Sequence, residues 1–507
     1  MSDIEKYESP KHVDESAEDL FSQRSHQQFA DVADNEARVA QLAQEMGINT
    51  RKLMWKIDLW VVPPFCLLYF LSFLDRVNIS NAKLYGIVDD LHLKGNEYNT
   101  ALTLFFVPYI VFEILLNYVI KKIRPRYWLA GLIFIFGVIS IGMGFVTNFG
   151  GLAACRFLLG MSEALTFPAI FYVLLTYYSK YEAQQRFSAF FSVTTLAGAA
   201  SGSIAWRIKD LDGRYGIAAW QWIFIIEGTF TAGLAFVLLF LIPDFPEELR
   251  FLNANEVEFL KRKLEIINGS LSAHEIKFKI KDVFNVLKDY MIWLPTLGYF
   301  ACIVPAYAIA FFLAQIVKDL GYTAVAAQAH SVYPWLCAFG LCNIVAFLSD
   351  RTRWRYPFFL ATGCIAIAGL GMVLGLTDAN VRYAGTFLTC MGLYTAMPTL
   401  ICWQTLSFGS HIRKSVGLAC IIGFGNIGGI ISTFLFLQKD APQFTTGLGV
   451  CIAMMALSLI VGTAILISFW WQNKRKQTPE YQNYFYSLPE REQKMLGDRA
   501  PTFKYMY

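Results

Sequence analysis

Long apolar segments follow one another along most of the chain, separated by short polar stretches, and the first fifty residues are polar. Each apolar segment is long enough to cross a bilayer as an α-helix, which takes about 20 residues. The pattern predicts twelve spanning helices, at 57–80, 98–120, 128–147, 150–176, 187–206, 220–242, 290–316, 331–349, 356–376, 383–405, 415–437 and 445–471.

A polar stretch at 243–289 divides these segments into six and six, and its sequence FPEELRFLNANEVEFLKRKLE predicts a charged amphipathic helix. Short basic loops follow both the second and the eighth span, which is typical of transporters built from duplicated halves. We expect a mostly disordered cytosolic tail with a short helix near 34–46 (1–56), a six-helix bundle (57–242), a cytosolic central loop (243–289), a second six-helix bundle (290–471) and a cytosolic tail (472–507).

The composition supports an all-α integral membrane protein with two pseudo-symmetric six-helix halves. The chain is 55% hydrophobic and only 16% charged, whereas soluble domains carry about a quarter charged residues. The net charge of +4 is too small to indicate a nucleic-acid partner. The ten cysteines lie in apolar segments without a CxxC pair, so we interpret them as packing residues. We expect no cofactor, no metal site and no enzymatic chemistry.

The loop charges predict the orientation of the chain. Lys and Arg gather in the loops on the same side as the N-terminus, at 121–126, 351–355, 411–414 and 473–476. Because cytoplasmic loops carry the excess of basic residues, both termini are expected in the cytosol.

The first span carries an adjacent acid and base near its outer end, Asp75 and Arg76. A charge within the membrane costs roughly 2.5–3.5 kcal/mol on insertion scales, so such residues usually line a polar pathway. The alternative is that the helix stops at Ser72 and leaves the pair in the interface. The apolar pattern continues beyond the pair, however, and no Gly or Pro intervenes before Gly86.

The fourth span carries a second base and acid, Arg156 and Glu163. Seven residues separate them, which is about 10 Å along a helix and nearly the same face. These charges form either structural ion pairs between helices or a functional site. In a functional site the arginines would bind an anion, for which the forked guanidinium is suited, and the acids would carry protons.

Further polar residues lie on other spans of the first half. Tyr109, Glu113 and Asn117 follow one another at spacings of four and form a polar stripe on the second span. We expect Tyr109 to contact substrate, whereas Glu113 is either another proton site or a helix–helix hydrogen bond. Glu227 in the sixth span is interpreted as structural, paired within the protein.

The second half is almost without charge and offers neutral polar and aromatic groups instead. Each alone is ordinary for packing or a helix–helix hydrogen bond, but together they could form the second wall of a pocket. The candidates for substrate binding are Tyr307, Tyr394, Gln404 and Asn426, with Gln315 and Trp403 as further polar groups. The run GFGNIGG at 423–429 favours close helix approach.

The arrangement resembles the major facilitator superfamily. The run from Ala346 to Arg351 resembles its loop signature, which makes Asp350 and Arg351 a candidate gating loop; the first-half copy departs from it, with Lys121 and Lys122 in place of Asp-Arg. More specifically, five motifs resemble the anion:cation symporter family and its fungal allantoate and nicotinate permease branch: YFLSFLDRVNISNA (69–82), CRFLLGMSEALTFP (155–168), WIFIIEG (222–228), LIPDFPEE (241–248) and LGDRAPTFKY (496–505).

This resemblance implies a proton-coupled symporter that imports a small organic anion, nicotinate or allantoate, by alternating access. It also implies proton coupling at Asp75 and Glu163 and anion binding at Arg76 and Arg156. We expect a monomer in the plasma membrane, with the anion, protons and lipid as its partners. Two alternatives stay open: a transporter-like nutrient receptor and a passive uniporter.

Overall fold

The computed structural model describes residues 37–116, 124–164, 166–178, 180–245, 251–268, 286–352, 354–408, 411–437, 440–441, 443–489, 497–501 and 503–507. All regular structure in these residues is helical. Asn117, Lys121 and Lys122, which figured in the sequence analysis, lie outside them.

Six spans form the first half of the described chain. They are α2 (Thr50–Leu84), α4 (Glu97–Leu116), α5 (Pro125–Met143), the pair α6 (Phe149–Glu163) and α7 (Thr166–Tyr177), α8 (Lys180–Ile208) and α9 (Ala219–Leu241). The short α3 (Ile87–Asp90) connects α2 with α4.

The second half repeats this plan after α10 (Ala254–Asn268). Its spans are α12 (Tyr290–Asp319), α13 (Ala324–Thr352), α14 (Tyr356–Gly375), α15 (Ala379–Leu406), the pair α16 (His411–Gly425) and α17 (Ile427–Thr433), and α18 (Thr445–Arg475). The helix α19 (Pro479–Ser487) follows. The fourth span is two helices, as is the eleventh, which breaks at Asn426, whereas the sequence predicted a single helix for each.

The spans have the length and composition of membrane helices. Ten candidate spans satisfy both criteria in the described residues, and α4 and the α6–α7 pair occupy the two remaining positions. Large apolar side chains are exposed on the outside of the bundle, among them Phe236, Phe240 and Ile460. Because an exposed apolar surface of this extent is unfavourable in water, it is the surface that lipid covers.

Several helices begin at a side chain that satisfies the first free backbone N–H groups. Asn49 accepts a hydrogen bond from the backbone of Lys52 at the start of α2, and Asn148 caps α6 in the same way. Asp289 caps α12 and Asp378 caps α15. Such caps stabilise a helix end by about 1 kcal/mol and fix where the span begins.

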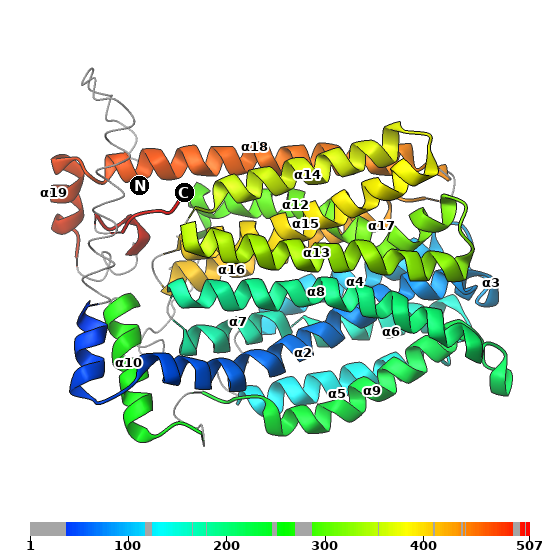
Figure 1. The fold of residues 1–507 in the computed structure, drawn as a ribbon, viewed down its shortest axis with the longest axis horizontal. Coiled ribbons are helices and arrows are strands. Elements are labelled where there is room, and N and C mark those ends of the chain that lie inside the picture. Colours follow the sequence, from blue (N-terminus) through cyan, green and yellow to red (C-terminus); the bar gives the residue numbers. More distant parts are fainter. Residues whose placement is uncertain are drawn as a thin grey trace.

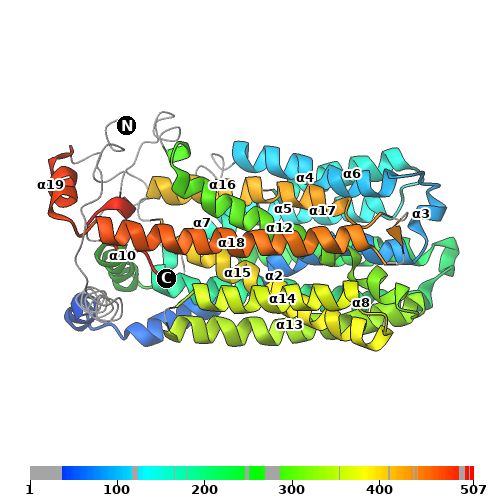
Figure 2. The ribbon, with the colours of Figure 1, turned by 90° about the horizontal axis from the view of Figure 1, so that it is seen from above.

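The same pairs of helices are in contact in both halves, as expected for a duplicated unit. When the spans are numbered 1 to 12 in chain order, span 1 of the first half contacts spans 5 and 6, span 2 contacts span 4, and span 3 contacts spans 4 and 6. The second half pairs span 7 with 11 and 12, 8 with 10, and 9 with 10 and 12. Figures 1 and 2 show the spans running alongside one another, with α10 and α19 at one end of the bundle and α3 at the other.

The two halves meet through α2, α4 and α8 of the first and α12, α13, α15, α16 and α17 of the second. Small residues permit the approach. A Cβ atom at Gly429 would overlap the Phe106 ring of α4, and one at Gly198 would lie 2.6 Å from the Trp335 ring of α13. At the α3 end, Asn99 donates to the backbone oxygen of Thr433, which joins α4 to α17.

Ion pairs join the amphipathic α10 to the first half at the opposite end. Lys56 of α2 lies 2.8 Å from Glu256, and Lys263 lies 2.6 Å from Glu182 of α8. The predicted amphipathic helix therefore lies across the ends of the spans (Figure 1).

The chain ends in a segment that packs on the second half at the α10 end. We call residues 497–501 and 503–507 the C-terminal strap. Its Tyr505 is buried, stacks on Phe469 with 4.7 Å between ring centroids and exchanges two hydrogen bonds with Asn473 of α18. The backbone N–H of Arg355 donates to the oxygen of Tyr507 over 2.8 Å. The strap thereby connects α18 with the start of α14.

Buried charges fasten the strap. Arg413 of α16 lies 2.6 Å from Asp498 in the strap and 2.7 Å from Asp289 at the start of α12. Arg499 also reaches Asp289, at 2.6 Å. Burial alone would raise the pKa of Asp289, but the two arginines hold that pKa below its usual range.

Lys476, directly after α18, is enclosed by the strap. Its ammonium lies 3.9 Å from the centroid of the Tyr505 ring and donates to the backbone oxygens of Phe503 and Asp498. Burial lowers the pKa of Lys476 to about 7, although the Asp498 carboxylate acts against this.

We predict that the strap binds more tightly as the pH rises from about 7 toward about 10, and that its affinity is constant below pH 7. Between these pH values, Lys476 is protonated when the strap is undocked and neutral when the strap is docked. The equilibrium constant for docking therefore rises up to about tenfold per pH unit. The measurement is the hydrogen-exchange protection of the Tyr505 amide in the purified protein. Lys476→Met should remove the slope, and the exposed Lys474→Met should keep it. An equal slope in Lys476→Met would contradict this.

Candidate functional site

The helix α2 continues through Asp75 and Arg76 to Leu84, so the pair lies within the helix and not at its end. Asp75, Arg76, Arg156 and Glu163 are 3%, 4%, 1% and 3% exposed, which places all four inside the protein and away from lipid. Because neighbouring helical residues project about 100° apart, Asp75 and Arg76 have different surroundings.

Arg76 contacts residues of both halves. One terminal nitrogen of its guanidinium pairs with Glu163 of α6, and the other donates to the hydroxyl of Tyr307 in α12. Tyr307 in turn donates to the side-chain oxygen of Asn426, at the break between α16 and α17, over 3.1 Å. Ser72, one turn earlier on α2, also donates to Glu163.

Aromatic rings surround the Arg76 guanidinium. Its central carbon lies 5.0 Å from the ring centroid of Phe105, 5.5 Å from that of Tyr109 and 5.4 Å from that of Tyr307. An arginine over ring faces gains cation–π attraction, which grows when water is excluded. The Nε of Arg76 has no hydrogen-bond partner among the described residues, so the group retains a free donor.

Asp75 lies on the other side of α2, inside the first half. It accepts a hydrogen bond from Ser140 of α5, and it interacts electrostatically with Arg156 of α6. In the described residues, the Nε and one terminal nitrogen of Arg156 and one oxygen of Asp75 are buried without a hydrogen-bond partner. Each acid therefore faces the arginine of the other helix: Glu163 of α6 faces Arg76 of α2, and Asp75 of α2 faces Arg156 of α6.

Two further buried acids differ in their surroundings. Neither oxygen of Glu113 has a hydrogen-bond partner among the described residues, and its carboxyl group interacts electrostatically with Arg76. Glu227 of α9 accepts a hydrogen bond from Asn78, one helical turn from Asp75, and Asn78 also accepts one from Ser201 of α8. Glu227 thus takes part in a polar network among α2, α8 and α9.

Several residues suggested by the sequence form hydrogen bonds with groups other than Arg76 and its partners Glu163 and Tyr307. The hydroxyl of Tyr394 donates to the backbone of Ala306, and Gln404 donates to the backbone of Pro295, both in α12. Gln315 donates to Asp319, and Trp403 donates to Met506 in the C-terminal strap. Tyr307 and Asn426 are the two second-half candidates that reach Arg76 directly or through one hydrogen bond.

The candidate gating loop has a partner that the sequence analysis did not identify. Asp350 pairs with Arg355 at 2.8 Å, and Arg351 is exposed. Arg355 also donates to Ser349, so these groups connect the end of α13 to the start of α14.

The sequence analysis also missed Ser72 and Ser140, which donate to the acids Glu163 and Asp75, and Phe105, whose ring lies beside the Arg76 guanidinium. Helical spacing could have identified Ser72, which precedes Arg76 by four residues. Ser140 lies alone in an apolar segment, and Phe105 is one of many phenylalanines, so neither carries a distinguishing signal.

Close packing of α6 against α4 positions Arg156 and Glu163. Gly160 lies between them in the sequence, and a Cβ atom there would overlap the backbone oxygen of Phe105. The absence of a side chain therefore lets α6 approach the helix that carries Phe105 and Tyr109.

Comparison with known proteins identifies the family. The model of the Major Facilitator Superfamily matches residues 65–465, so the chain belongs to this superfamily. The solved structure of a bacterial homologue of the human lysosomal transporter Spinster, inward-facing and unoccupied, has a TM-score of 0.59 at 14% identity, covering 83% of this chain and 97% of that one. The fold is therefore that of a membrane transporter.

Two fungal transporters are similar over nearly the whole length. A high-affinity nicotinic acid transporter of Saccharomyces cerevisiae is 29% identical over 500 residues, which is 97% of this chain and 93% of the relative. The major facilitator-type transporter hxnP of Emericella nidulans is 28% identical over 466 residues, 89% of this chain and 92% of the relative.

We predict that Gly160→Ala sharply lowers the amount of folded protein and its thermal stability in detergent, because the added carbon meets a backbone atom that cannot rotate away. The matched control is Gly233→Ala in α9, where nothing lies within 4 Å of the new carbon. Removing a glycine from an open helical position should stabilise by roughly 0.5–1 kcal/mol. Equal melting temperatures of the two variants would contradict the packing argument.

Proposed function

We propose that this protein is a proton-coupled symporter that imports a small organic anion by alternating access, with the α10 end in the cytosol. The observation that carries the proposal is Arg76, which contacts an acid of the first half and a phenol of the second. A group that touches both halves is sensitive to their relative movement, and transporters of this architecture move their halves around a central site.

Arg76 is suited to receive a carboxylate. Its guanidinium is buried, always charged and forked, and it retains one free donor. The rings of Phe105, Tyr109 and Tyr307 provide flat apolar faces around it, which would suit the body of a planar substrate. Arg156 has two donor nitrogens without a hydrogen-bond partner among the described residues, and it is the second anion-binding group of the proposal.

Glu163 is the proposed proton carrier, because it is the counterion that an incoming anion must replace. While ionised, Glu163 occupies the Arg76 guanidinium. Protonation from outside would neutralise Glu163 and release Arg76 for the substrate carboxylate. After the halves change position, loss of that proton to the cytosol would restore the ion pair and expel the anion.

Asp75 with Arg156 repeats this arrangement within the first half, where Ser140 holds the acid. We assign Asp75 to proton coupling with Glu163. Glu113 is proposed as a further proton site, since it is buried near Arg76 without a hydrogen-bond partner among the described residues. Tyr307 and Asn426 would respond to the substrate on the side of the second half. Tyr394 and Gln404, which donate to the backbone of α12, stay proposed as further groups of that half.

The substrate class follows from the arginines and from the relatives. A relative 29% identical over 97% of this chain is a nicotinic acid transporter, so nicotinate is our first candidate and allantoate the second. We propose the plasma membrane as the location and a monomer as the unit. A passive uniporter would keep its uptake when the pH gradient is collapsed, and a pure receptor would show no uptake at all.

Glu163→Gln should abolish accumulation driven by a pH gradient while it preserves exchange of labelled for unlabelled substrate. Glutamine resembles a permanently protonated glutamate, so substrate can bind but the proton cannot be released. The assay compares net uptake with counterflow of labelled nicotinate in vesicles that contain the purified protein. Normal accumulation by this variant would remove Glu163 from the coupling mechanism.

We predict that a lysine at the position of either arginine does not support normal substrate binding. Arg76→Lys and Arg156→Lys keep the charge but lose the fork, and a lost charge-assisted hydrogen bond of about 1.5–3 kcal/mol weakens binding roughly 10- to 100-fold. Uptake is measured per surface-exposed protein, with nicotinate and nicotinamide as competitors. Wild type should reject the uncharged amide.

The same experiment separates binding from structural roles. If Arg156 is only structural, Arg156→Lys lowers the amount of protein and leaves the affinity of the surviving protein for the acid unchanged. Arg76 then remains as the anion site.

A further inference from the structure

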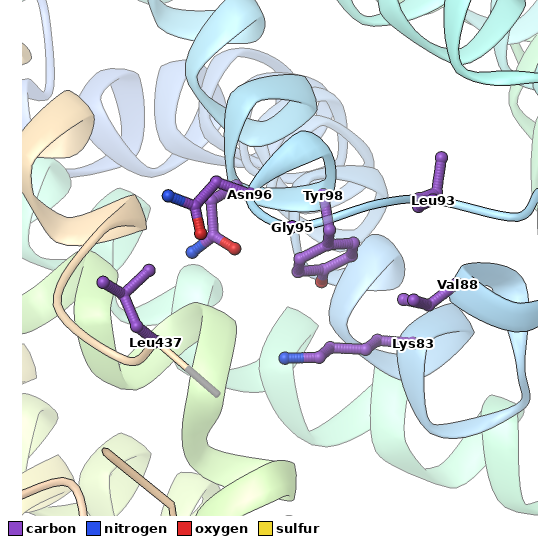
Figure 3. Close-up of a pocket in the computed structure, with 8 residues that line it drawn as sticks. Lys83, Val88, Leu93, Gly95, Asn96, Tyr98 and Leu437 are labelled. Atoms are coloured by element: carbon purple, nitrogen blue, oxygen red, sulfur yellow. The ribbon is translucent and has the colours of Figure 1, made fainter. Parts of the chain in front are cut away.

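A pocket of about 420 Å³ opens at the α3 end of the bundle, away from the candidate site. Its lining comes from the end of α2, from α3 and the loop after it, from the start of α4 and from the segment after α17 (Figure 3). Lys83, Asn96, Tyr98 and Leu437 are among the residues that line it.

Lys83 is the charged group of this lining. It is half-buried, with its ammonium 4.9 Å from the ring centroid of Tyr98 and 5.4 Å from that of Phe312 in α12. Figure 3 shows its nitrogen pointing into the pocket, toward the side where Asn96 and Leu437 lie. The ammonium of Lys83 makes no hydrogen bond and no ion pair within 4 Å in the described part of the chain, so its three donors are free for a ligand.

The position of Lys83 connects the pocket with the candidate site. Lys83 follows Arg76 by seven residues on α2, which places it about 10 Å further along the same face of the helix. Tyr98 stands between the two regions, since its ring lies beside Lys83 and its phenol interacts electrostatically with Arg156. Three cations therefore form a series from the pocket inward: Lys83, Arg156 and Arg76.

We propose that this pocket is an outer binding site for the substrate's carboxylate, which Lys83 holds on its way to the two arginines. The proposal rests on the proposed function, which makes the α3 end the outer face. The amide group of Asn96 adds a second donor to the pocket lining, and the ring of Tyr98 offers a face to a flat substrate.

The pocket also depends on the position of the two halves. Phe312 and Leu437 belong to the second half, and the charge of Asp319 at the end of α12 attracts Lys83. When the outer ends separate, Lys83 loses Phe312 and Asp319 together. The substrate carboxylate would then replace Asp319 as the partner of Lys83, so capture accompanies opening.

The test is the concentration dependence of initial nicotinate uptake by cells, per surface-exposed protein. Lys83→Met should raise KM about three- to tenfold, as expected for a partly exposed ion contact, while kcat changes less than twofold. Lys83→Arg should restore KM to within about twofold, because the charge returns. The matched control is Lys94→Met, which removes an exposed charge in the loop after α3 that does not line the pocket, and its KM should equal that of wild type.

An unchanged KM in Lys83→Met, or an equal rise in Lys94→Met, would overturn the outer site. A loss of kcat at unchanged KM would also overturn it and assign Lys83 to gating. These results differ from a failure of the proposed function, in which wild type would transport nicotinamide as well as nicotinate or would accumulate neither. If Lys83→Met does not reach the surface, the KM values of Lys83→Gln, which also lacks the charge, and of Lys83→Arg, which keeps it, are compared in its place.

Discussion

The ion pair between Arg76 and Glu163 is the interaction on which the rest of the site depends. Either charge alone, buried among the helices, would cost several kcal/mol, so each requires the other or a replacement of the same sign. In the proposed mechanism, the pair would open when a proton neutralises Glu163 or an anion takes its place. Because Arg76 also touches Tyr307 of the second half, a change in the pair reaches the contact between the halves. In the mechanism we propose, this single constraint would couple proton, anion and movement.

The packing around the pair keeps water and alternative partners away. Gly160 brings α6 against α4, Gly429 brings α17 against Phe106, and the rings of Phe105 and Tyr109 enclose the guanidinium. In such surroundings electrostatic interactions are stronger than in water, and an unpartnered group is correspondingly unfavourable. In the described part of the chain, two nitrogens of Arg156 and the oxygens of Glu113 are buried without a hydrogen-bond partner, so a ligand or a proton would have a large effect there.

The sequence predicted the spans, the two halves and the buried charges, because hydrophobic length and intramembrane charge are strong local signals. It did not predict which acid faces which base, since Asp75 and Arg76 are adjacent and only the packing of α2 decides their partners. The break of the fourth span after Glu163 had a signal that the sequence analysis did not use, because Pro168 lacks the N–H that would bond the backbone oxygen of Ala164. The C-terminal strap was also missed, because its anchors, such as Asn473 with Tyr505, join residues from a helix and a polar tail. Long-range partners of this kind are set by tertiary packing.

The most direct test of the coupling is the number of protons taken up when substrate binds to the purified protein in weakly buffered detergent solution. An anion that displaces Glu163 from Arg76 should bring about one proton with it at a pH near 7, and Glu163→Gln should take up at least half a proton less. Uptake of no proton by wild type at saturating nicotinate, with binding confirmed by calorimetry in the same buffer, would contradict the exchange of a protonated Glu163 for the substrate carboxylate.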